Sequence, residues 1–323
     1  MTLQKLAELA HVSVSTASKA FSGSPDISEK TKQLVIKTAK KYNCFEQFDK
    51  GIYHKKIIAV ICPELRGGYY SEYVTELERR IREMGSTMAL SISHFDSGNA
   101  NELFLYHSQY QKTDGIILIG PPDEIKNPNN FPAVALSHTA EENWLSVQND
   151  LYSPIREAVF HLASMGHKDI VFLGELKTEG KQKYYEQAME EAGLPPRSVV
   201  TDARFEQCGY LGMSSLLSSL PTAVITAYDS VAIGAIHFLQ SKGIRIPEEI
   251  SVIGMDNISV TPYLSNPLTT ISSCIPETCD KLLELLLKKM DQKQFTSNES
   301  IIIPGTLIHR SSVCKPRRIK IPV

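Results

Sequence analysis

Residues 12–21 read VSVSTASKAF, and this segment decides how the N-terminal part of the chain is interpreted. If the segment is helical, Ala17, Ala20 and Phe21 stand at positions i, i+3 and i+4 and share one face. The hydroxyl side chains between them, and Lys19, then point away from that face. Because small hydroxyl groups allow a close approach to another surface, the segment predicts a short helix that packs with one side and meets a partner with the other.

Two more short helices are expected beside this one. Thr2 is placed to cap a first helix, Ser13 to cap the second through Phe21, and Ser28 to cap a third. The inward face of the third helix is expected to carry Thr31, Leu34, Val35, Thr38 and Ala39. Two short helices joined by a tight turn and braced by a third describe a helix-turn-helix, whose second helix enters the major groove of DNA. The alternative is a three-helix packing module that binds no nucleic acid.

The charge of the chain is divided unevenly along its length. The net charge of the 323 residues is −2, but residues 1–56 carry ten lysines and five carboxylates, a net +5, and the remainder carries −7. A basic head on an acidic body indicates a polyanion as partner of the head, although a solvated lysine-rich face has the same composition. A chain of this length is expected to form two or three domains.

Several classes of protein are excluded by composition. No run approaches the roughly 18 apolar residues of a membrane span, and the N-terminus lacks the pattern of a secretory signal, so we expect a cytoplasmic, nucleoid-associated protein that contacts no membrane. The six cysteines are scattered, without CxxC pairs or histidines at zinc spacing. We therefore expect reduced thiols, no metal site and no cofactor.

From Lys56 onward, apolar runs alternate with segments of helical periodicity. The runs expected to form strands are 57–62, 87–93, 115–120, 133–137, 169–174, 223–227, 251–255 and 301–308. Alternating strands and helices predict an α/β fold with doubly wound parallel sheets. No GxGxxG opens a helix after the first strand, and GxSxG, HExxH and the phosphate-loop pattern are absent from the sequence, so we expect neither a dinucleotide site nor catalytic residues.

Residues 2–43 closely resemble the DNA-binding headpiece of the LacI/GalR family of bacterial transcription regulators. The resemblance lies in the alanine-rich first helix, the V-S-x-x-T-[VA]-S-[RK] pattern of the second, the S/G turn and the S-E-x-T start of the third. It implies that Val14, Ser15 and Lys19 contact bases and that Thr16 and Ser18 lie beside phosphates. Two positions depart from the family pattern: His11 replaces a common glycine, and Lys19 stands where arginine is frequent.

The rest of the chain resembles the periplasmic-binding-protein-like sensor of the same family. The segments HLASMGHKDIVFLG (161–174), DSVAIGAIHFLQSKGIRIPEEISVIGMDN (229–257), NPLTTI (266–271) and GTLIHRSS (305–312) carry the resemblance. It implies two lobes that the chain crosses three times. The expected domains are a headpiece at 1–43, a hinge at 44–56, a sensor at 57–312 and a basic tail at 313–323. Within the sensor, lobe 1 is expected at 57–142 plus 272–297, and lobe 2 at 145–270 plus 298–312.

The expected hinge, residues 44–56, departs from the family's Y-x-P-N-x-x-A-R-x-L. Cys44 stands in place of Pro, Asp49 in place of Arg and Gly51 at the position of the DNA-inserting leucine. Ile52 would be a substitute wedge in the minor groove one residue later. The alternative is a plain linker whose aromatic residues pack on the sensor.

The cleft between the lobes is expected to bind the effector, since parallel sheets bind ligands at the carboxyl ends of their strands. The candidate effector-binding residues are Tyr69, Tyr70, Trp144, Asp150, Lys181, Asp229 and Asp256. Each aspartate follows an apolar run, which suits a ligand carboxylate but also a helix cap, and for Asp229 the cap is the alternative we favour. The two tyrosines either stack on a sugar or pack on their neighbours.

These features predict a repressor of carbohydrate-utilisation genes that binds a palindromic operator as a homodimer and responds to a sugar or sugar phosphate. A second interpretation is a regulator controlled by a phosphorylated carrier protein, as in the family's catabolite-control members, or a sensor domain that has lost its operator specificity. A third is a solute-binding protein or sugar-modifying enzyme without a DNA role.

Overall fold

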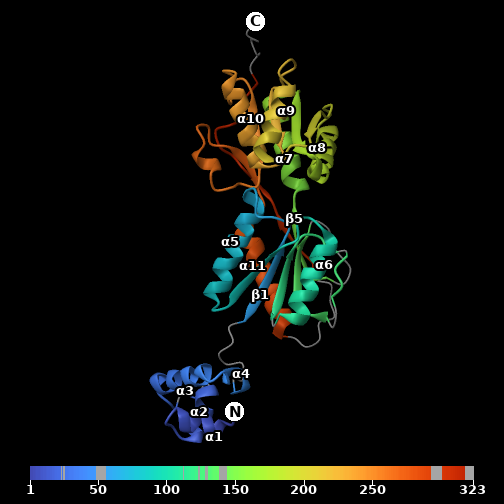
Figure 1. The fold of residues 1–323 in the computed structure, drawn as a ribbon. Helices are drawn as coiled ribbons and strands as arrows, with labels where there is room; N and C mark the ends of the chain where they lie inside the picture. Colours follow the sequence, from blue (N-terminus) through green and yellow to red (C-terminus); the bar gives the residue numbers. More distant parts are fainter. Residues whose placement is uncertain are drawn as a thin grey trace. The chain divides into compact units, whose positions relative to one another are not determined.

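The computed structural model describes residues 1–22, 24, 26–48, 56–111, 113–122, 124–127, 130–137, 144–291 and 300–316. The chain divides into two compact units, residues 1–56 and 57–323 (Figure 1). Each unit has its own apolar core. No helix among the described residues is both long and apolar enough to span a membrane.

The first unit is the expected helix-turn-helix. Its helices are α1 (Leu3–Leu9), α2 (Val14–Phe21), α3 (Glu29–Lys41) and the single turn α4 (Phe45–Phe48). The three predicted caps are confirmed: the hydroxyls of Thr2, Ser13 and Ser28 accept hydrogen bonds from the amides of Lys5, Thr16 and Thr31. Because each cap satisfies an amide that the helix itself leaves unpaired, these hydroxyls fix where the helices begin.

The core of this unit differs from the expected one at two places. Leu34, which we expected to face inward, is 49% exposed, whereas Ile36 is buried. Phe45 and Phe48 pack on the headpiece core, where their rings lie 6.0 and 5.8 Å from that of Phe21. These two linker aromatics therefore contribute to the core of the first unit. Residues 49–55, with Ile52, lie outside the described part of the chain.

The second unit contains two six-stranded sheets, one in each lobe. The first has the order β11-β5-β4-β3-β1-β2 and is parallel throughout. Its strands are β1 (Ile57–Cys62), β2 (Thr87–Ile92), β3 (Gly115–Ile119), β4 (Ala133–Ser137), β5 (Ser146–Asp150) and β11 (Ser300–Pro304). Helices α5 (Gly68–Glu83) and α11 (Ile275–Asp291) cover one face, and α6 (Ser97–Leu105), extended by the π-helical turn Tyr106–Tyr110, covers the other (Figure 1).

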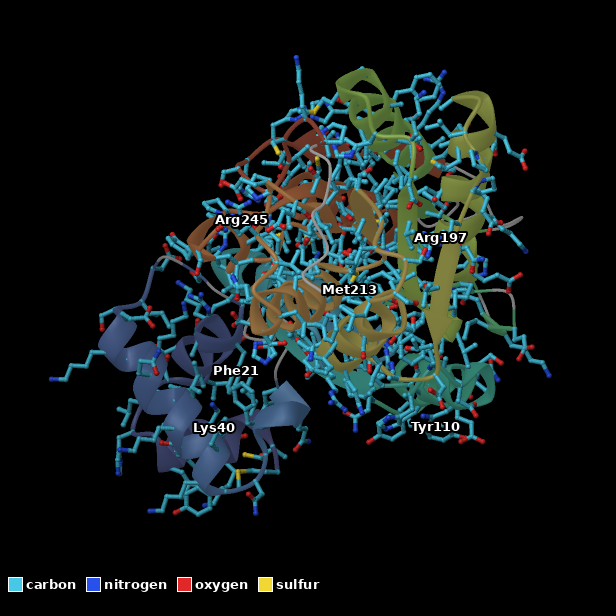
Figure 2. All side chains as sticks on the ribbon, turned by 90° about the horizontal axis from the view of Figure 1, so that it is seen from above. Phe21, Lys40, Tyr110, Arg197, Met213 and Arg245 are labelled. Atoms are coloured by element: carbon cyan, nitrogen blue, oxygen red, sulfur yellow. The ribbon has the colours of Figure 1, made fainter. Side chains whose placement is uncertain are left out.

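The second sheet has the order β12-β10-β9-β8-β6-β7. Its strands are β6 (Ile170–Glu175), β7 (Ser198–Thr201), β8 (Ala223–Thr226), β9 (Ser251–Met255), β10 (Thr269–Ser272) and the antiparallel β12 (Thr306–Ile308). Helices α7 (Tyr152–Met165) and α8 (Glu179–Glu191) cover one face, and α9 (Phe205–Ser215) and α10 (Asp229–Ser241) the other. Met213 of α9 is buried in this core, whereas Tyr110 of lobe 1 is exposed (Figure 2).

The chain crosses between the lobes three times, as expected, but the predicted lobe boundaries are wrong at two strands. Strand β5 and strand β11, which we assigned to lobe 2, belong to the sheet of lobe 1. The run 301–308 is not one strand, because it divides at Gly305 into β11 and β12 of different sheets. A Cβ at Gly305 would lie 2.8 Å from the carbonyl oxygen of Asp150, so the crossing chains run too close for a side chain.

Helices α9 and α10 pack with their backbones in contact through two glycines. A Cβ on Gly209 would overlap the carbonyl of Val231, and one on Gly234 would overlap the carbonyl of Glu206. Neither obstacle is a side chain that could rotate away. This contact holds together the two helices of lobe 2 whose N-terminal ends lie beside the cleft.

We therefore expect Gly234→Ala to lower the free energy of unfolding by about 1–3 kcal/mol, because an added methyl forces the two helices apart. Urea unfolding measures the change. Gly180→Ala is the matched control, since a Cβ at that helical position meets no atom within 4 Å. Equal stability of the two variants would contradict the packing described here.

Candidate functional site

The outward face of α2 carries the residues predicted to contact DNA. Ala17, Ala20 and Phe21 are buried in the headpiece core, while Val14 is 45% exposed and Ser15 is exposed. Thr16 and Ser18 are half-buried at the edges of this face. An exposed valine beside short hydroxyl side chains, at the N-terminal end of the helix, suits contact with base edges in a major groove.

Lys19 has a partner that the sequence did not reveal. Its Nζ lies 2.9 Å from Oδ2 of Asp26, and both side chains are exposed. The hydrogen bond and charge of Lys19 lower the pKa of Asp26. Because exposed ion pairs contribute little to stability, Lys19 can exchange this carboxylate for an acceptor on DNA at small cost. Asp26 was missed because it lies seven residues away, across the turn between α2 and α3.

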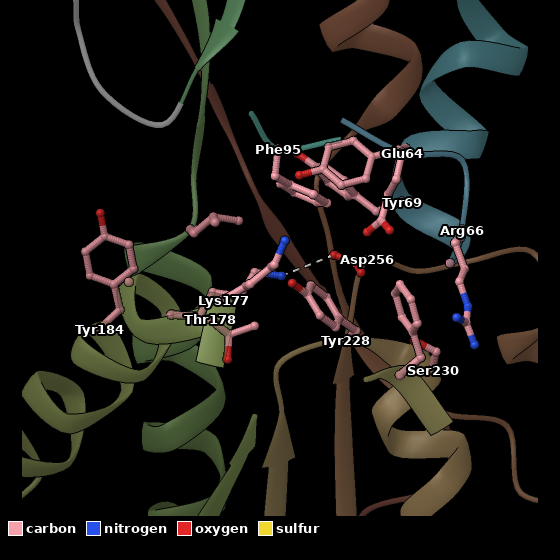
Figure 3. Close-up of a pocket in the computed structure, with 17 residues that line it drawn as sticks. Glu64, Arg66, Tyr69, Phe95, Lys177, Thr178, Tyr184, Tyr228, Ser230 and Asp256 are labelled. Carbon is pink, nitrogen blue, oxygen red and sulfur yellow. Dashed lines mark hydrogen bonds and ion pairs between the residues drawn. The ribbon is translucent and has the colours of Figure 1, made fainter. Parts of the chain in front are cut away.

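A cavity of about 560 Å³ lies between the two lobes of the second unit (Figure 3). It is bounded by loops that follow the carboxyl ends of strands in both sheets, the place expected for a ligand site in parallel sheets. Lobe 1 lines it with Glu64, Arg66, Gly67, Gly68, Tyr69, Tyr70 and Phe95. Residues after the first crossing line it with Leu151, Lys177, Thr178, Gly180, Lys181, Tyr184, Phe205, Tyr228, Ser230 and Asp256.

Four of the predicted effector-binding residues lie together at this cavity: Tyr69, Tyr70, Lys181 and Asp256. The centre of the group is an ion pair between Lys181 Nζ and Asp256 Oδ1 at 3.4 Å, drawn as a dashed line in Figure 3. Lys181 also donates to the carbonyl of Ala227 at 2.7 Å and lies over the ring of Tyr228. Asp256 itself is only 5% exposed, so the pair is largely removed from water.

Three of the predicted residues do not line the cavity. Trp144 packs in the core of lobe 1, edge-on to Phe104 of α6 at 5.8 Å. Asp150 accepts a hydrogen bond from the amide of Ser153 and so caps α7. Asp229 is fully buried and accepts hydrogen bonds from the amide of Ile258 and the hydroxyl of Thr270. The placement of these three residues therefore does not support effector contact. The role that we favoured for Asp229, a cap of α10, is also wrong, because its carboxylate binds Ile258 and Thr270 and makes no cap hydrogen bond to its own helix.

Aromatic rings from both lobes form much of the cavity wall. On the side of lobe 1, the rings of Tyr69 and Tyr70 meet edge-on at 5.1 Å, and those of Tyr70 and Phe95 at 5.9 Å. On the side of lobe 2, Phe205 and Tyr228 lie 6.2 Å apart. Such faces suit stacking on a flat ring or on the apolar face of a sugar. Burial raises the pKa of the Tyr69, Tyr70 and Tyr228 hydroxyls, which keeps these groups neutral hydrogen-bonding partners.

An ion cluster joins the lobes at the edge of the cavity. Arg204 of lobe 2 donates through both terminal nitrogens to Glu64 of lobe 1, at 2.9 and 2.7 Å. The same guanidinium lies 3.3 Å from Glu175, a carboxylate that is 2% exposed at the end of β6. This cluster could not be predicted from the sequence, because its three members lie far apart along the chain and come together only in the folded protein.

Two glycines let the lobes approach at the same edge. A Cβ on Gly67 would lie 2.5 Å from the nearest ring carbon of Phe205, and one on Gly68 would overlap Ile258, both of lobe 2. Gly67 has a φ of +79°, in the region that side chains disfavour. Because neither position has room for a side chain, the two glycines determine how closely the lobes approach each other beside the cavity.

Groups suited to other chemistry are few in the described part of the chain. No cluster of three or more histidine, cysteine or carboxylate side chains within it could hold a metal ion. Cys44, Cys62, Cys208, Cys274 and Cys279 are free thiols. The described site consists of binding groups, with cations, hydroxyls and ring faces around one buried carboxylate.

Burial raises the pKa of Asp256 from 3.8 to about 6, against the opposing charge of Lys181. The folded chain therefore keeps this proton at pH values where the unfolded chain has released it, so this carboxyl makes the chain less stable as the pH rises from 4 to 6. We predict that Asp256→Asn removes this pH dependence. Between pH 4 and 6, the free energy of unfolding of the variant should therefore rise relative to that of the wild type. Urea unfolding at stepped pH measures it.

The control is Asp202→Asn, which neutralises an exposed carboxylate away from the cavity. Its difference from wild type should stay constant over the same interval. Parallel pH profiles for Asp256→Asn and the wild type would contradict the raised pKa.

Comparison with known proteins assigns both units. Residues 2–44 match the family model of bacterial regulatory proteins of the lacI family, and residues 159–313 match that of the periplasmic binding protein-like domain. The regulator DegA of Bacillus subtilis is 27% identical over 96% of this chain and 97% of its own length. The repressor PurR of Actinobacillus pleuropneumoniae is 29% identical over 96% and 98%.

Among solved structures, a Lac repressor dimer bound to operator and the anti-inducer ONPF has the same fold, with a TM-score of 0.79, 21% identity and coverage of 97% of this chain and 99% of that one. The relatives DegA and PurR are regulators of transcription rather than enzymes. With its helix-turn-helix headpiece and two-lobed sensor, the chain belongs to the LacI family of DNA-binding transcription regulators.

Proposed function

We propose that the chain represses transcription of carbohydrate-utilisation genes by binding a palindromic operator as a homodimer, and that a sugar or sugar phosphate between the lobes switches it. The observation that carries this proposal is the cavity, in which both lobes contribute walls around the buried Lys181–Asp256 pair. A ligand that contacts both walls binds the two lobes differently when they are open and closed, which is the condition for shifting a conformational equilibrium.

The DNA-binding part of the proposal rests on α2. One headpiece reads only half of a site, so a two-fold symmetric dimer and a palindromic operator go together. Val14, Ser15 and Lys19 are proposed to contact bases, with Thr16 and Ser18 beside phosphates. Relatives support this arrangement, since PurR is named as a repressor and the Lac repressor structure is a dimer on its operator.

The first test is selection of DNA from a random pool by the full chain, with and without a panel of sugars. A palindromic sequence whose affinity changes with one sugar is the expected result. A palindrome bound equally under all conditions would favour control by a carrier protein. Binding without sequence preference, and with steep salt dependence, would contradict the operator proposal.

Lys19→Ala should weaken binding to the selected palindrome by about 1–3 kcal/mol and binding to random DNA by much less, because a base contact is lost only where the right base is present. Lys5→Ala is the control, since it removes the same charge from α1, outside the recognition helix. Fluorescence anisotropy on both DNAs measures the two affinities. Equal losses on both DNAs would show that Lys19 contacts only phosphate.

A further inference from the structure

The cavity wall carries more cationic than carboxylate side chains. Three cationic side chains line it, Arg66, Lys177 and Lys181, together with the carboxylates Glu64 and Asp256. Both terminal nitrogens of Arg204 already bind Glu64, and Lys181 pairs with Asp256. Each of the two carboxylates of the cavity wall therefore already has a cationic partner.

Lys177 and Arg66 are left without a carboxylate partner among the residues that the structure describes. The Nζ of Lys177 lies 3.6 Å from the ring centre of Phe95, and the guanidinium of Arg66 lies 5.6 Å from that of Phe205. Figure 3 shows Lys177 and Arg66 among the residues that line the cavity. Ring faces position these cations but do not neutralise them, so either can accept an anion without first breaking a salt bridge.

Uncapped helix ends add to this positive field. The N-cap residues of α5, α9 and α10 are Gly67, Arg204 and Tyr228, and none supplies a side-chain acceptor to its helix. Gly67, Phe205 and Tyr228, at the starts of these three helices, line the cavity. By contrast, side-chain oxygens of Thr2, Ser13, Ser28 and Asp96 cap α1, α2, α3 and α6, which begin elsewhere. The positive ends of these helix dipoles therefore lie at the cavity.

We propose that the ligand of this cavity is an anion: a small molecule whose phosphate or carboxylate group is held by Lys177, with Arg66 as a further donor. Its uncharged part lies between the rings of Tyr70 and Tyr228, within reach of the Lys181–Asp256 pair. This inference rests on the proposed function, since it specifies the chemistry of the effector that the cleft binds. Charge-assisted hydrogen bonds to a phosphate or carboxylate are the strong kind that a partly water-exposed cavity needs for selectivity.

The test compares neutral compounds with their charged counterparts on the full chain. Thermal unfolding is followed with D-ribose and D-ribose 5-phosphate, and with D-glucose, D-glucose 6-phosphate and D-gluconate, at equal concentrations and at two salt concentrations. We expect one charged compound to raise the Tm well above its neutral parent, because a ligand that binds only the folded state stabilises it. The phosphates and the carboxylate distinguish the two kinds of anion, and added salt should reduce the shift.

Lys177→Gln should then weaken binding of that charged compound by about tenfold, the loss of one charged hydrogen bond, and leave the neutral parent nearly unaffected. Lys183→Gln is the matched control, because it removes the same charge from an exposed position on α8 that does not line the cavity. It should change neither affinity.

Two results would overturn the inference while leaving the proposed function standing: a neutral sugar that binds as tightly as its charged counterpart, or an equal loss of both in Lys177→Gln. If no compound of either series shifts the Tm, the cleft binds neither class, and the sugar-like effector and the anion inference are both rejected.

Discussion

The structure of the sensor depends on the placement of one guanidinium. Glu175 ends β6 as a carboxylate almost without solvent contact, and such a group requires a cation beside it. Arg204 supplies that cation from the start of α9 and, with the rest of its planar fork, binds Glu64 in the other lobe. A second bond between the lobes runs from the amide of Ser259 to Glu72. The separation of the two walls is therefore set by polar contacts that a charged ligand between them would perturb.

Local signals in the sequence were sufficient for much of the fold. The three hydroxyl caps of the headpiece and the long apolar strands, such as 57–62 and 251–255, lie where they were expected. Strands β5, β7 and β10 were not predicted, because the short segments SVQND, SVVT and TTIS lack a long apolar run. Their place is decided by pairing with neighbouring strands, which a single sequence does not display.

Local sequence signals also predicted part of the candidate site. Asp256 was found because it directly follows an apolar run, and that run is a central strand whose end opens on the cleft. The same reasoning failed at Asp150 and Asp229, whose carboxylates bind the backbone amides of Ser153 and Ile258 and do not line the cavity. Phe95, Arg204 and Phe205 were missed because no local sequence pattern marks them, and only the folded chain brings them to the cavity or its edge. His11, in place of a common glycine, still adopts the left-handed φ of 54° that the turn requires.

In a ligand-switched regulator, ligand binding in the cleft and DNA binding by the headpiece must change each other's affinity. Binding free energies must be reciprocal, so a ligand that changes the affinity for DNA has its own affinity changed by the same factor. The most direct test is calorimetric titration of the cleft ligand into the full chain, alone and saturated with its selected DNA. Coupling predicts two different ligand affinities, whose ratio equals the ratio of DNA affinities with and without ligand. Identical ligand affinities in both titrations would show that the two units of this chain bind independently.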